Sequence, residues 1–344
     1  MKKVLVAMSG GVDSAVAALR LIEAGYDVQG ITLCLLDGKT DEAQRAAAVC
    51  ERIGIKHTCL HLEKEFEREV QQNFVQAYCG GLTPNPCVVC NKKIKFGALM
   101  DYALQNGFDM LATGHYAAIE KMGDRYVIKK AADKTKDQTY MLWQLSQDVL
   151  SRVLFPLSDY KKSENREKAA QYSLENADSP DSQDICFIDN GDYAAFIEGF
   201  TGKKAEPGNF VDTSGRVLGA HGGVIRYTIG QRKGLGIALG KPRFVISKNA
   251  ADNTVVLGDE QDLFYSRILL KDVNYQMFDK PQKELEVTAK LRYSQFESKA
   301  VLIPTENGAV LEFEKPQRAP APGQTAVFYI DDALVGGGII VKGE

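Results

Sequence analysis

The feature that most constrains this chain is a strand that passes directly into a helix through a glycine-rich loop, in VLVAMSGGVDSAVAALRL at residues 4–21. The apolar residues 4–8 predict a buried parallel strand. Apolar side chains at helical spacing over residues 15–22 predict the helix. A helix start needs one capping oxygen, which Asp13 or Ser14 can supply. It does not need two glycines and a further serine.

The surplus residues predict a loop that wraps an anion. Gly10 and Gly11 let backbone N–H groups approach closely, and the helix N-terminus adds a positive dipole. Ser9 and Ser14 would donate their hydroxyl protons to phosphate oxygens. The pattern is neither G-x-x-x-x-G-K-[ST] nor G-x-G-x-x-G. SGGVDS resembles the PP-loop of ATP pyrophosphatases, which implies adenylation of a carbonyl oxygen with release of pyrophosphate.

The chain has 344 residues, too many for one compact core, so we expect several domains. Strand and helix patterns alternate over residues 1–115, which predicts an α/β domain with a doubly wound parallel sheet, and residues 137–200 read as helical. After residue 201, short alternating strands with turn residues predict two small β-rich domains. We expect a PP-loop catalytic domain with a helical extension at 1–200, a central β-rich domain at 201–275 and a C-terminal β-barrel domain at 276–344.

Composition is ordinary for a globular protein, with 44% hydrophobic and 25% charged residues. No long apolar run is present and the chain starts directly with a strand, which predicts a cytoplasmic protein without membrane contact. The net charge of −3 does not favour a strong nucleic-acid binder, but local lysine clusters are typical of a protein with one basic face. These clusters are Lys92, Lys93 and Lys95, then Lys129, Lys130, Lys134 and Lys136, then Lys161 and Lys162.

Seven cysteines are an odd number, which in a cytoplasmic chain favours thiols, catalytic groups or metal ligands over a disulfide framework. Cys79, Cys87 and Cys90 lie in CGGLTPNPCVVCNKKIKF. The prolines predict a rigid, non-helical loop, followed by a helix over about residues 92–105. Cys90 would then precede a helix start with adjacent lysines, which lowers a thiol pKa.

The residues alone leave three interpretations of these cysteines open. One is a zinc or cluster site with C-x-x-C as half of its ligands. The second is a redox or sulfur-carrying pair that includes the distant Cys186, and the third is plain buried thiols. For the other cysteines, which are Cys34, Cys50, Cys59 and also Cys79, we favour the role of small core residues.

Seven motifs occur in one order along the whole chain: the PP-loop, TPNPCVVCNKKIKFG, ATGHYA, TKDQTYMLWQL, SQDICFI, YTIGQRKGLG and PGQTAVFY. Together they closely resemble the bacterial tRNA-specific 2-thiouridylases (the MnmA/TrmU family). The resemblance implies that ATP, with Mg²⁺, adenylates the C2 oxygen of the wobble uridine of tRNAs for Lys, Glu and Gln. A persulfide sulfur then replaces that oxygen, giving 2-thiouridine, AMP and pyrophosphate. The implied partners are tRNA and a sulfur-donor protein, either a cysteine desulfurase or a sulfur relay protein.

The resemblance also assigns site residues by their place in the motifs. Cys90 corresponds to the nucleophile and Cys186 to the cysteine that carries the persulfide, and the two would form a disulfide after transfer. The implied ATP-binding residues are Ala7, Met8, Ser9, Gly10, Gly11, Val12, Asp13, Ser14, Leu33 and Gly114. The implied contacts with the target base and tRNA are Asn85, Pro86, Cys87, His115, Lys136, Asp137, Gln138, Arg292, Tyr293 and Gln324.

Cys87 departs from the family pattern, because many relatives have Asp at this position with an acid/base role. A thiol is a poorer general acid or base at neutral pH. An alternative is therefore an iron–sulfur cluster held by Cys87, Cys90 and Cys186, whereas our first choice is persulfide chemistry without a metal. Two other functions compete: a synthetase that adenylates a small carbonyl substrate, and a non-catalytic RNA-binding protein with structural ATP. Pyrophosphate release that depends on tRNA distinguishes them.

Overall fold

The computed structural model describes residues 1–38, 40–172, 174 and 184–344. The first part of the chain is organised around a five-stranded parallel sheet with strand order β3-β2-β1-β4-β7. The order confirms the predicted doubly wound sheet, because it reverses beside β1 and brings the ends of β1 and β4 to one carboxyl edge. The strands are β1 (Lys3–Ala7), β2 (Asp27–Cys34), β3 (His57–His61), β4 (Met110–Ala112) and β7 (Val153–Leu154).

Alternate residues of β1 pack on opposite faces of this sheet. Val4 and Val6 lie in a core with residues of three helices, whereas Leu5 lies in a second core with Phe96 and Leu99. Both faces of β1 are therefore buried from solvent, as its continuous apolar run predicts. The three helices are α1 (Val12–Glu23), α2 (Asp41–Arg52) and α8 (Lys162–Gln171). Within the stretch 137–200 that reads as helical, α8 is observed up to Gln171, and residues 173 and 175–183 lie outside the described residues.

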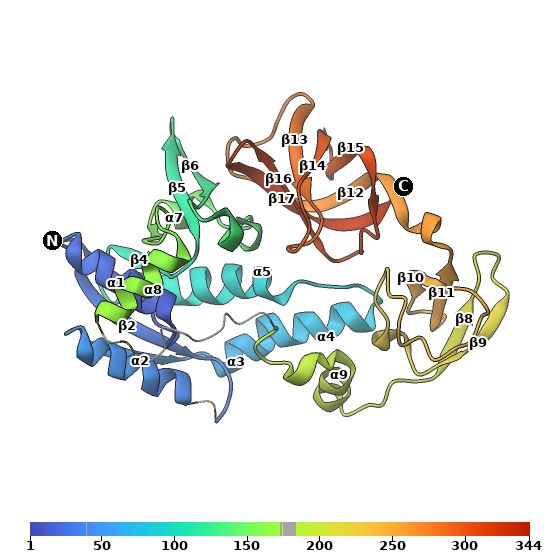
Figure 1. Cartoon of the computed structure of the whole chain (residues 1–344), viewed down its shortest axis with the longest axis horizontal. Coiled ribbons are helices and arrows are strands. Elements are labelled where there is room, and N and C mark those ends of the chain that lie inside the picture. The colour runs from blue at the N-terminus through green and yellow to red at the C-terminus, as the bar shows by residue number, and fades with distance from the viewer. Residues whose placement is uncertain (39, 173, 175–183) are drawn as a thin grey trace.

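Two long composite helices lead from this sheet toward the central β domain, beneath the C-terminal barrel (Figure 1). The first is α3 (Glu63–Phe66), η1 (Glu67–Gln71) and α4 (Gln72–Cys79); the second is α5 (Pro86–Cys90), η2 (Asn91–Ala98) and α6 (Leu99–Gln105). Both contain a π-helical segment in the middle, a feature often found near functional sites. Within the described part of the chain, no helix is long and apolar enough to cross a bilayer.

The segment TKDQTYMLWQL is not the helix that its pattern predicted. It forms only short turns and is buried between the parallel sheet and the barrel, where Tyr140, Leu142 and Trp143 are fully buried. Close packing requires a glycine here, because a Cβ on Gly337 would lie 2.7 Å from the Trp143 ring. The short elements of the region are η3 (Lys134–Lys136), η4 (Thr139–Met141), α7 (Gln147–Leu150), η5 (Asp189–Gly191) and α9 (Tyr193–Thr201).

The two β-rich domains are present as predicted. The central one is a four-stranded sheet with order β10-β11-β8-β9, followed by the short helix η7 (Glu260–Leu263) that leads to the barrel. Its elements are β8 (Gly208–Val211), β9 (Val217–His221), η6 (Val224–Arg226), β10 (Phe244–Asn249) and β11 (Thr254–Gly258).

The C-terminal sheet closes into a barrel, because β12 pairs with both β15 and β17. Its strands are β12 (Phe264–Tyr275), β13 (Leu285–Lys290), β14 (Ser298–Thr305), β15 (Gly308–Arg318), β16 (Thr325–Ile330) and β17 (Ala333–Gly343). The sheets thus change between Gly258 and Phe264, whereas the predicted boundary lay at residues 275 and 276. The difference arises because β12, one long strand that ends at Tyr275, already belongs to the barrel.

A hairpin that the sequence analysis missed joins the first part of the chain to this barrel. Its strands are β5 (Ala117–Met122) and β6 (Arg125–Lys130), and Lys129 of β6 pairs with Ala333 of β17. Alternating polar and apolar residues around Gly123-Asp124 are the signal that could have revealed it.

Candidate active site

The PP-loop connects β1 to α1 at the carboxyl edge of the parallel sheet. Gly10 has a positive φ of 75°, and a Cβ there would lie 2.9 Å from the Glu42 carbonyl oxygen. The predicted cap is wrong: Gly11, not Asp13 or Ser14, is the N-cap residue, and no side chain makes a cap hydrogen bond. The N–H groups of the first turn of α1 are therefore left for another acceptor, which suits an anion.

The two serines of the loop bond to the loop itself in this structure. The Ser14 hydroxyl donates to the Gly11 carbonyl at 3.0 Å, and the Ser9 N–H donates to the Ser14 hydroxyl at 3.2 Å. The Ser9 and Ser14 hydroxyl oxygens lie 3.3 Å apart. These bonds hold the loop in a compact shape around the start of α1, so donation by either hydroxyl to a phosphate stays a prediction.

Asp13 lies inside the first turn of α1 and is held by residues far along the chain. Its two carboxylate oxygens accept hydrogen bonds from the Lys162 ammonium at 2.8 and 2.7 Å, and the Tyr116 hydroxyl donates to one of them at 2.9 Å. Asn165 donates to the Tyr116 hydroxyl at 3.0 Å and accepts from Arg20 at 2.8 Å. Burial raises the pKa of Tyr116 far above its usual value, so its hydroxyl keeps the proton that it donates. The sequence analysis assigned none of these partners to Asp13.

Gly114 follows β4 and packs directly against the PP-loop. A Cβ on Gly114 would lie 2.9 Å from the Asp13 carbonyl carbon and 2.9 Å from the Ser14 nitrogen. Such distances are too short for any side chain, so glycine is required for the strand end to meet the start of α1. The structure thus brings Gly114 to the loop that is predicted to bind ATP.

The remaining predicted ATP contacts lie along the same edge. Ala7 ends β1, the Met8 N–H donates to the Ile31 carbonyl at 2.7 Å, and Val12 begins α1. Leu33, near the end of β2, is partly buried between two cores.

His115 is buried rather than displayed on the surface. It lies between the rings of Phe96 and Phe155, and one of its ring nitrogens shares a hydrogen bond of 2.7 Å with the Thr113 hydroxyl. Burial, with a smaller effect from Lys95, holds its pKa well below the usual value, so His115 is neutral at neutral pH. Its predicted contact with tRNA stays a prediction.

The cysteine segment begins its helix earlier than predicted. Asn85 caps α5 by accepting from the N–H groups of Cys87 and Val88 at 3.1 and 3.4 Å, and Pro86 occupies the first helical position. Proline at this position costs no hydrogen bond, because that N–H has no partner inside the helix. The interpretation of TPNP as a wholly non-helical loop was wrong, and Asn-Pro before an apolar run was the signal of a helix start.

Cys90 therefore lies inside the helix, and its thiol is not activated in this structure. Burial raises the pKa of Cys90 to about 12, opposed by the positive charge of Lys95. The expectation of a lowered pKa is wrong for this conformation, because burial outweighs the charge. Lys95 is the lysine whose charge lowers the pKa of Cys90, whereas Lys93 forms an ion pair with Glu69.

Two further cysteines lie close to this thiol. Cys87 and Cys186 both lie close enough to Cys90 to raise its pKa further. Cys186 is exposed, and so is the Cys87 residue, although burial of its thiol raises the pKa of Cys87 too. Part of the SQDICFI motif, Ser182 and Gln183, lies outside the described residues. The structure therefore brings together the predicted nucleophile, the predicted persulfide carrier and the residue that departs from the family.

The predicted tRNA contacts of the buried turn segment make bonds within the protein. Lys136 ends η3, and the Gln138 side chain accepts from the Tyr116 N–H at 2.9 Å. Asp137 accepts from the Thr139 hydroxyl at 2.9 Å, and burial raises the pKa of its carboxyl.

The three predicted contacts of the last domain join the domains to one another. Gln324 donates to the Pro84 carbonyl at 3.4 Å, and the Tyr293 hydroxyl donates to the Asp137 carbonyl at 3.2 Å. Arg292 donates to backbone carbonyls on both sides of the boundary between the central domain and the barrel, at 3.2 and 2.9 Å. Gln324 thus contacts the TPNP loop, and a direct contact of these three residues with tRNA stays a prediction.

The predicted lysine clusters are in part paired. Lys129, Lys130 and Lys134 form ion pairs with Glu120, Glu297 and Asp332, at 2.7, 2.6 and 2.5 Å.

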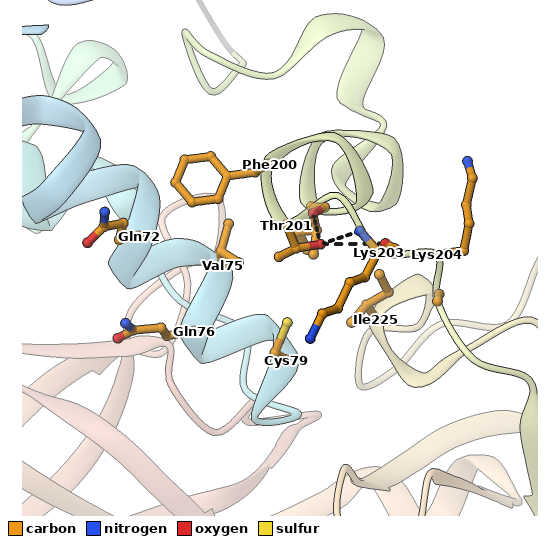
Figure 2. A pocket seen from close by; sticks show the side chains of 11 residues that line it. Gln72, Val75, Gln76, Cys79, Phe200, Thr201, Lys203, Lys204 and Ile225 are labelled. Atoms are coloured by element: carbon orange, nitrogen blue, oxygen red, sulfur yellow. Dashed lines mark hydrogen bonds between the residues drawn. The ribbon is translucent and has the colours of Figure 1, made fainter. Parts of the chain in front are cut away.

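The cysteines expected in the core differ among themselves. Cys50 is fully buried, as predicted, but Cys59 and Cys79 are exposed and Cys34 is half-buried. Cys79 lines a hollow of about 470 Å³ between α4, α9 and the segment at 203–205, together with Val75 and Phe200 (Figure 2). None of the predicted site residues lines this hollow.

Known families match the chain along its length. A model described as tRNA methyl transferase HUP domain matches residues 2–190, one described as tRNA methyl transferase PRC-barrel domain matches 194–259, and one described as Aminomethyltransferase beta-barrel domain matches 265–340. Relatives include tRNA-specific 2-thiouridylase MnmA 1 of Clostridium botulinum (strain Loch Maree / Type A3), which is 48% identical with 99% of each chain covered. MnmA 2 of Clostridium tetani is 48% identical over 98% of each chain, and MnmA of Acetivibrio thermocellus is 45% identical over 98% of this chain and 99% of its own. The PP-loop at the sheet edge, the two β domains and these full-length matches agree, and the chain belongs to the MnmA/TrmU family of tRNA-specific 2-thiouridylases within the PP-loop superfamily.

Proposed function

We propose that this protein is an ATP-dependent tRNA 2-thiouridylase that acts on the wobble uridine of tRNAs for Lys, Glu and Gln. The observation that supports the proposal is that the PP-loop and the helix that carries Cys87 and Cys90 are connected by packed residues. Gly114 packs on the PP-loop, the next residue, His115, packs on Phe96, and Phe96 lies on the helix that also carries Cys87 and Cys90. The packed residues after β4 thus hold the PP-loop and the cysteine helix in a fixed position relative to each other.

In the first step, ATP activates the base. The uncapped first turn of α1 and Gly10 receive the pyrophosphate end of ATP, while Lys162 and Tyr116 keep Asp13 from swinging into that space. The C2 oxygen of uridine attacks the α-phosphorus, and the bond to the β-phosphate oxygen breaks, so pyrophosphate leaves. A carbonyl oxygen, a poor leaving group, becomes part of a phosphate ester that can depart as AMP.

In the second step, sulfur replaces that oxygen. The Cys90 thiol attacks the inner sulfur of a Cys186 persulfide, which forms a Cys90–Cys186 disulfide and releases hydrosulfide. Hydrosulfide adds to C2, AMP leaves, and the base loses a proton to give 2-thiouridine. A thiol reductant then supplies two electrons to restore both cysteines. ATP enters as its Mg²⁺ complex, and a cysteine desulfurase or relay protein of the cytoplasm loads Cys186.

The raised pKa of Cys90 fits a resting state that waits for substrate. A buried thiol with a pKa of about 12 is protonated at neutral pH and does not attack the persulfide prematurely. Lys95, on the same composite helix, is the positive charge that lowers this pKa, so a rearrangement of its side chain toward the Cys90 sulfur favours the thiolate. Cys87 stands where many relatives have Asp, and its own raised pKa keeps the thiol protonated, so it does not accept a proton in this conformation.

The test uses protein purified without air, and tRNA transcripts with uridine or cytidine at the wobble position. We expect pyrophosphate release only with the uridine transcript, and 2-thiouridine when a persulfide donor is added. Cys90→Ser and Cys186→Ser should abolish thiolation but keep pyrophosphate release, and Cys79→Ser, an exposed thiol elsewhere, should keep both. Cys87→Ala should remain active in preparations without iron.

Three outcomes would contradict the proposal in different ways. Activity that tracks iron content and disappears in Cys87→Ala would make this a cluster enzyme with the same product. Pyrophosphate release without tRNA would indicate a small carbonyl substrate. Methyl transfer from S-adenosylmethionine without ATP, which the name of the matching tRNA methyl transferase family model suggests, would refute thiolation.

A further inference from the structure

A second group of metal-ligating side chains lies at the carboxyl edge of the parallel sheet, away from the Cys87–Cys90 helix. Cys34 is the last residue of β2, and His61, its partner in the register, is the last residue of β3. Cys59 lies two residues before His61, so the two side chains point to the same face of β3. Glu63 follows at the start of α3.

The side chains converge to within reach of one ion. The Cys34 sulfur, a His61 ring nitrogen and a Glu63 carboxylate oxygen all lie within 4.8 Å of one another. His61 Nδ1 is 2.8 Å from Glu63 Oε1, and the Cys59 thiol is in hydrogen-bonding contact with Cys34. Bonds of about 2.0–2.3 Å around a tetrahedral zinc hold ligand atoms about 3.3–3.8 Å apart. Movements of about 1 Å therefore suffice to bring the Cys34, His61 and Glu63 ligand atoms to such distances. The contact of Cys59 with Cys34 makes its thiol the candidate for the fourth ligand.

We propose that Cys34, Cys59, His61 and Glu63 bind a zinc ion that joins the ends of β2 and β3. Two sulfurs, one imidazole and one carboxylate are the ligands that zinc prefers, whereas Mg²⁺ and Ca²⁺ prefer oxygen. Binding converts both thiols to thiolates and releases their protons to solvent. The exposed Cys59 and His61 leave an open path for the ion.

The position of the site gives it a structural consequence. Cys34 directly follows Leu33, and β3 is the edge strand of the sheet. As an edge strand, β3 is hydrogen-bonded within the sheet to β2 alone. An ion bound by residues of both strands would hold β3 in place by additional bonds. It stabilises the folded state by mass action, since the unfolded chain does not hold the ligands together. This inference is independent of the proposed function.

Cobalt(II) serves as the probe, because thiolate ligation gives it a charge-transfer absorption that zinc lacks. The full-length protein is prepared without air, stripped with a chelator and titrated with Co²⁺, and then with Zn²⁺ in competition. All measurements use a background in which Cys87, Cys90 and Cys186 are alanine, because those thiols also bind soft metals. Far-ultraviolet circular dichroism reports whether each variant is folded.

We expect one Co²⁺ per chain with a thiolate band, displaced by Zn²⁺ with release of protons. Cys34→Ser and Cys59→Ser should weaken binding by about 100-fold or more and reduce the band, since changes around the ligands alone cost about 10–100-fold. His61→Asn, at a side chain that is 72% exposed and hence harmless to folding, should weaken binding but keep the band. Cys79→Ser should change nothing. Loss of all binding in the alanine background, or unchanged binding in folded His61→Asn and Cys34→Ser, would overturn the proposal.

Discussion

Replacing Gly114 by alanine tests whether β4 supports the PP-loop. The new Cβ would lie 2.9 Å from the Asp13 carbonyl carbon and from the Ser14 nitrogen, and 3.1 Å from the Asp13 Cβ. Carbon atoms in contact are normally about 3.5–4.0 Å apart, so the two segments must separate by roughly 0.6 Å or more. The two nearest neighbours are backbone atoms of the first turn of α1, which cannot rotate away. Overpacking of this kind costs about 1–3 kcal/mol.

The displaced turn is the one that we expect to hold the phosphates of ATP. Misplacement of a reacting group by about 1 Å can cost about 100-fold in rate. We therefore expect tRNA-dependent pyrophosphate release to fall by about 10–100-fold, with a higher KM for ATP and an unchanged KM for tRNA. Steady-state kinetics with each substrate varied in turn separates these parameters.

Gly199→Ala is the matched control. Gly199 lies in α9 with no atom within 4 Å of its would-be Cβ, so alanine should stabilise the protein by about 0.5–1 kcal/mol and leave activity unchanged. Pyrophosphate release by Gly114→Ala within about twofold of wild type, with the same KM for ATP, would refute the reasoning that this contact shapes the ATP site.

Two further predictions concern buried charge. Lys162→Met removes the ammonium that holds Asp13, and should lower the free energy of unfolding by about 1–3 kcal/mol, less than for a fully buried pair because the Asp13 side chain is 30% exposed. Lys168, on the same helix as Lys162, pairs with Glu23 of α1, whose side chain is 47% exposed. Lys168→Met should therefore cost at most about 1 kcal/mol when both variants are compared by urea denaturation. Equal losses in the two variants would show that the Asp13 pair is no stronger than a pair with an exposed partner. For His115, the unfolded chain binds a proton below pH 6.5 that the folded protein does not, so stability falls by up to about 1.4 kcal/mol per pH unit as pH drops. The advantage of wild type over His115→Gln should therefore shrink between pH 7 and pH 5, and a constant difference would mean that His115 takes up a proton in the folded protein as readily as in the unfolded chain.

Local patterns in the sequence were enough to predict several parts of the fold. The apolar run of β1, the glycines of the loop and the helical spacing of α1 act over a few residues, so their structure follows from steric limits and periodicity. The same holds for the alternating strands after residue 201, which form the two β-rich domains. The motifs, read in order, predicted the family that the full-length matches confirm.

The structure corrected expectations that depended on what surrounds a residue. Cys90 next to lysines predicted an acidic thiol, but burial raises its pKa to about 12, and burial depends on packing from several parts of the chain. The cap of α1 was assigned to Asp13 or Ser14 by residue type, yet Asp13 turns to Lys162, which is 149 residues away in the sequence. No local pattern contains that pairing.

The sequence by itself determined the chemistry that this protein carries: a phosphate-binding loop, a set of thiols and the order of its domains. Only the tertiary structure decided which groups meet. It brought Gly114 against the PP-loop, gathered Cys87 and Cys186 around Cys90, and placed Cys34 and Cys59 beside His61 on adjacent strands. The physical reason is that sheet register and core packing are set by contacts between distant segments, whose side chains acquire their pKa values and partners only when those segments come together.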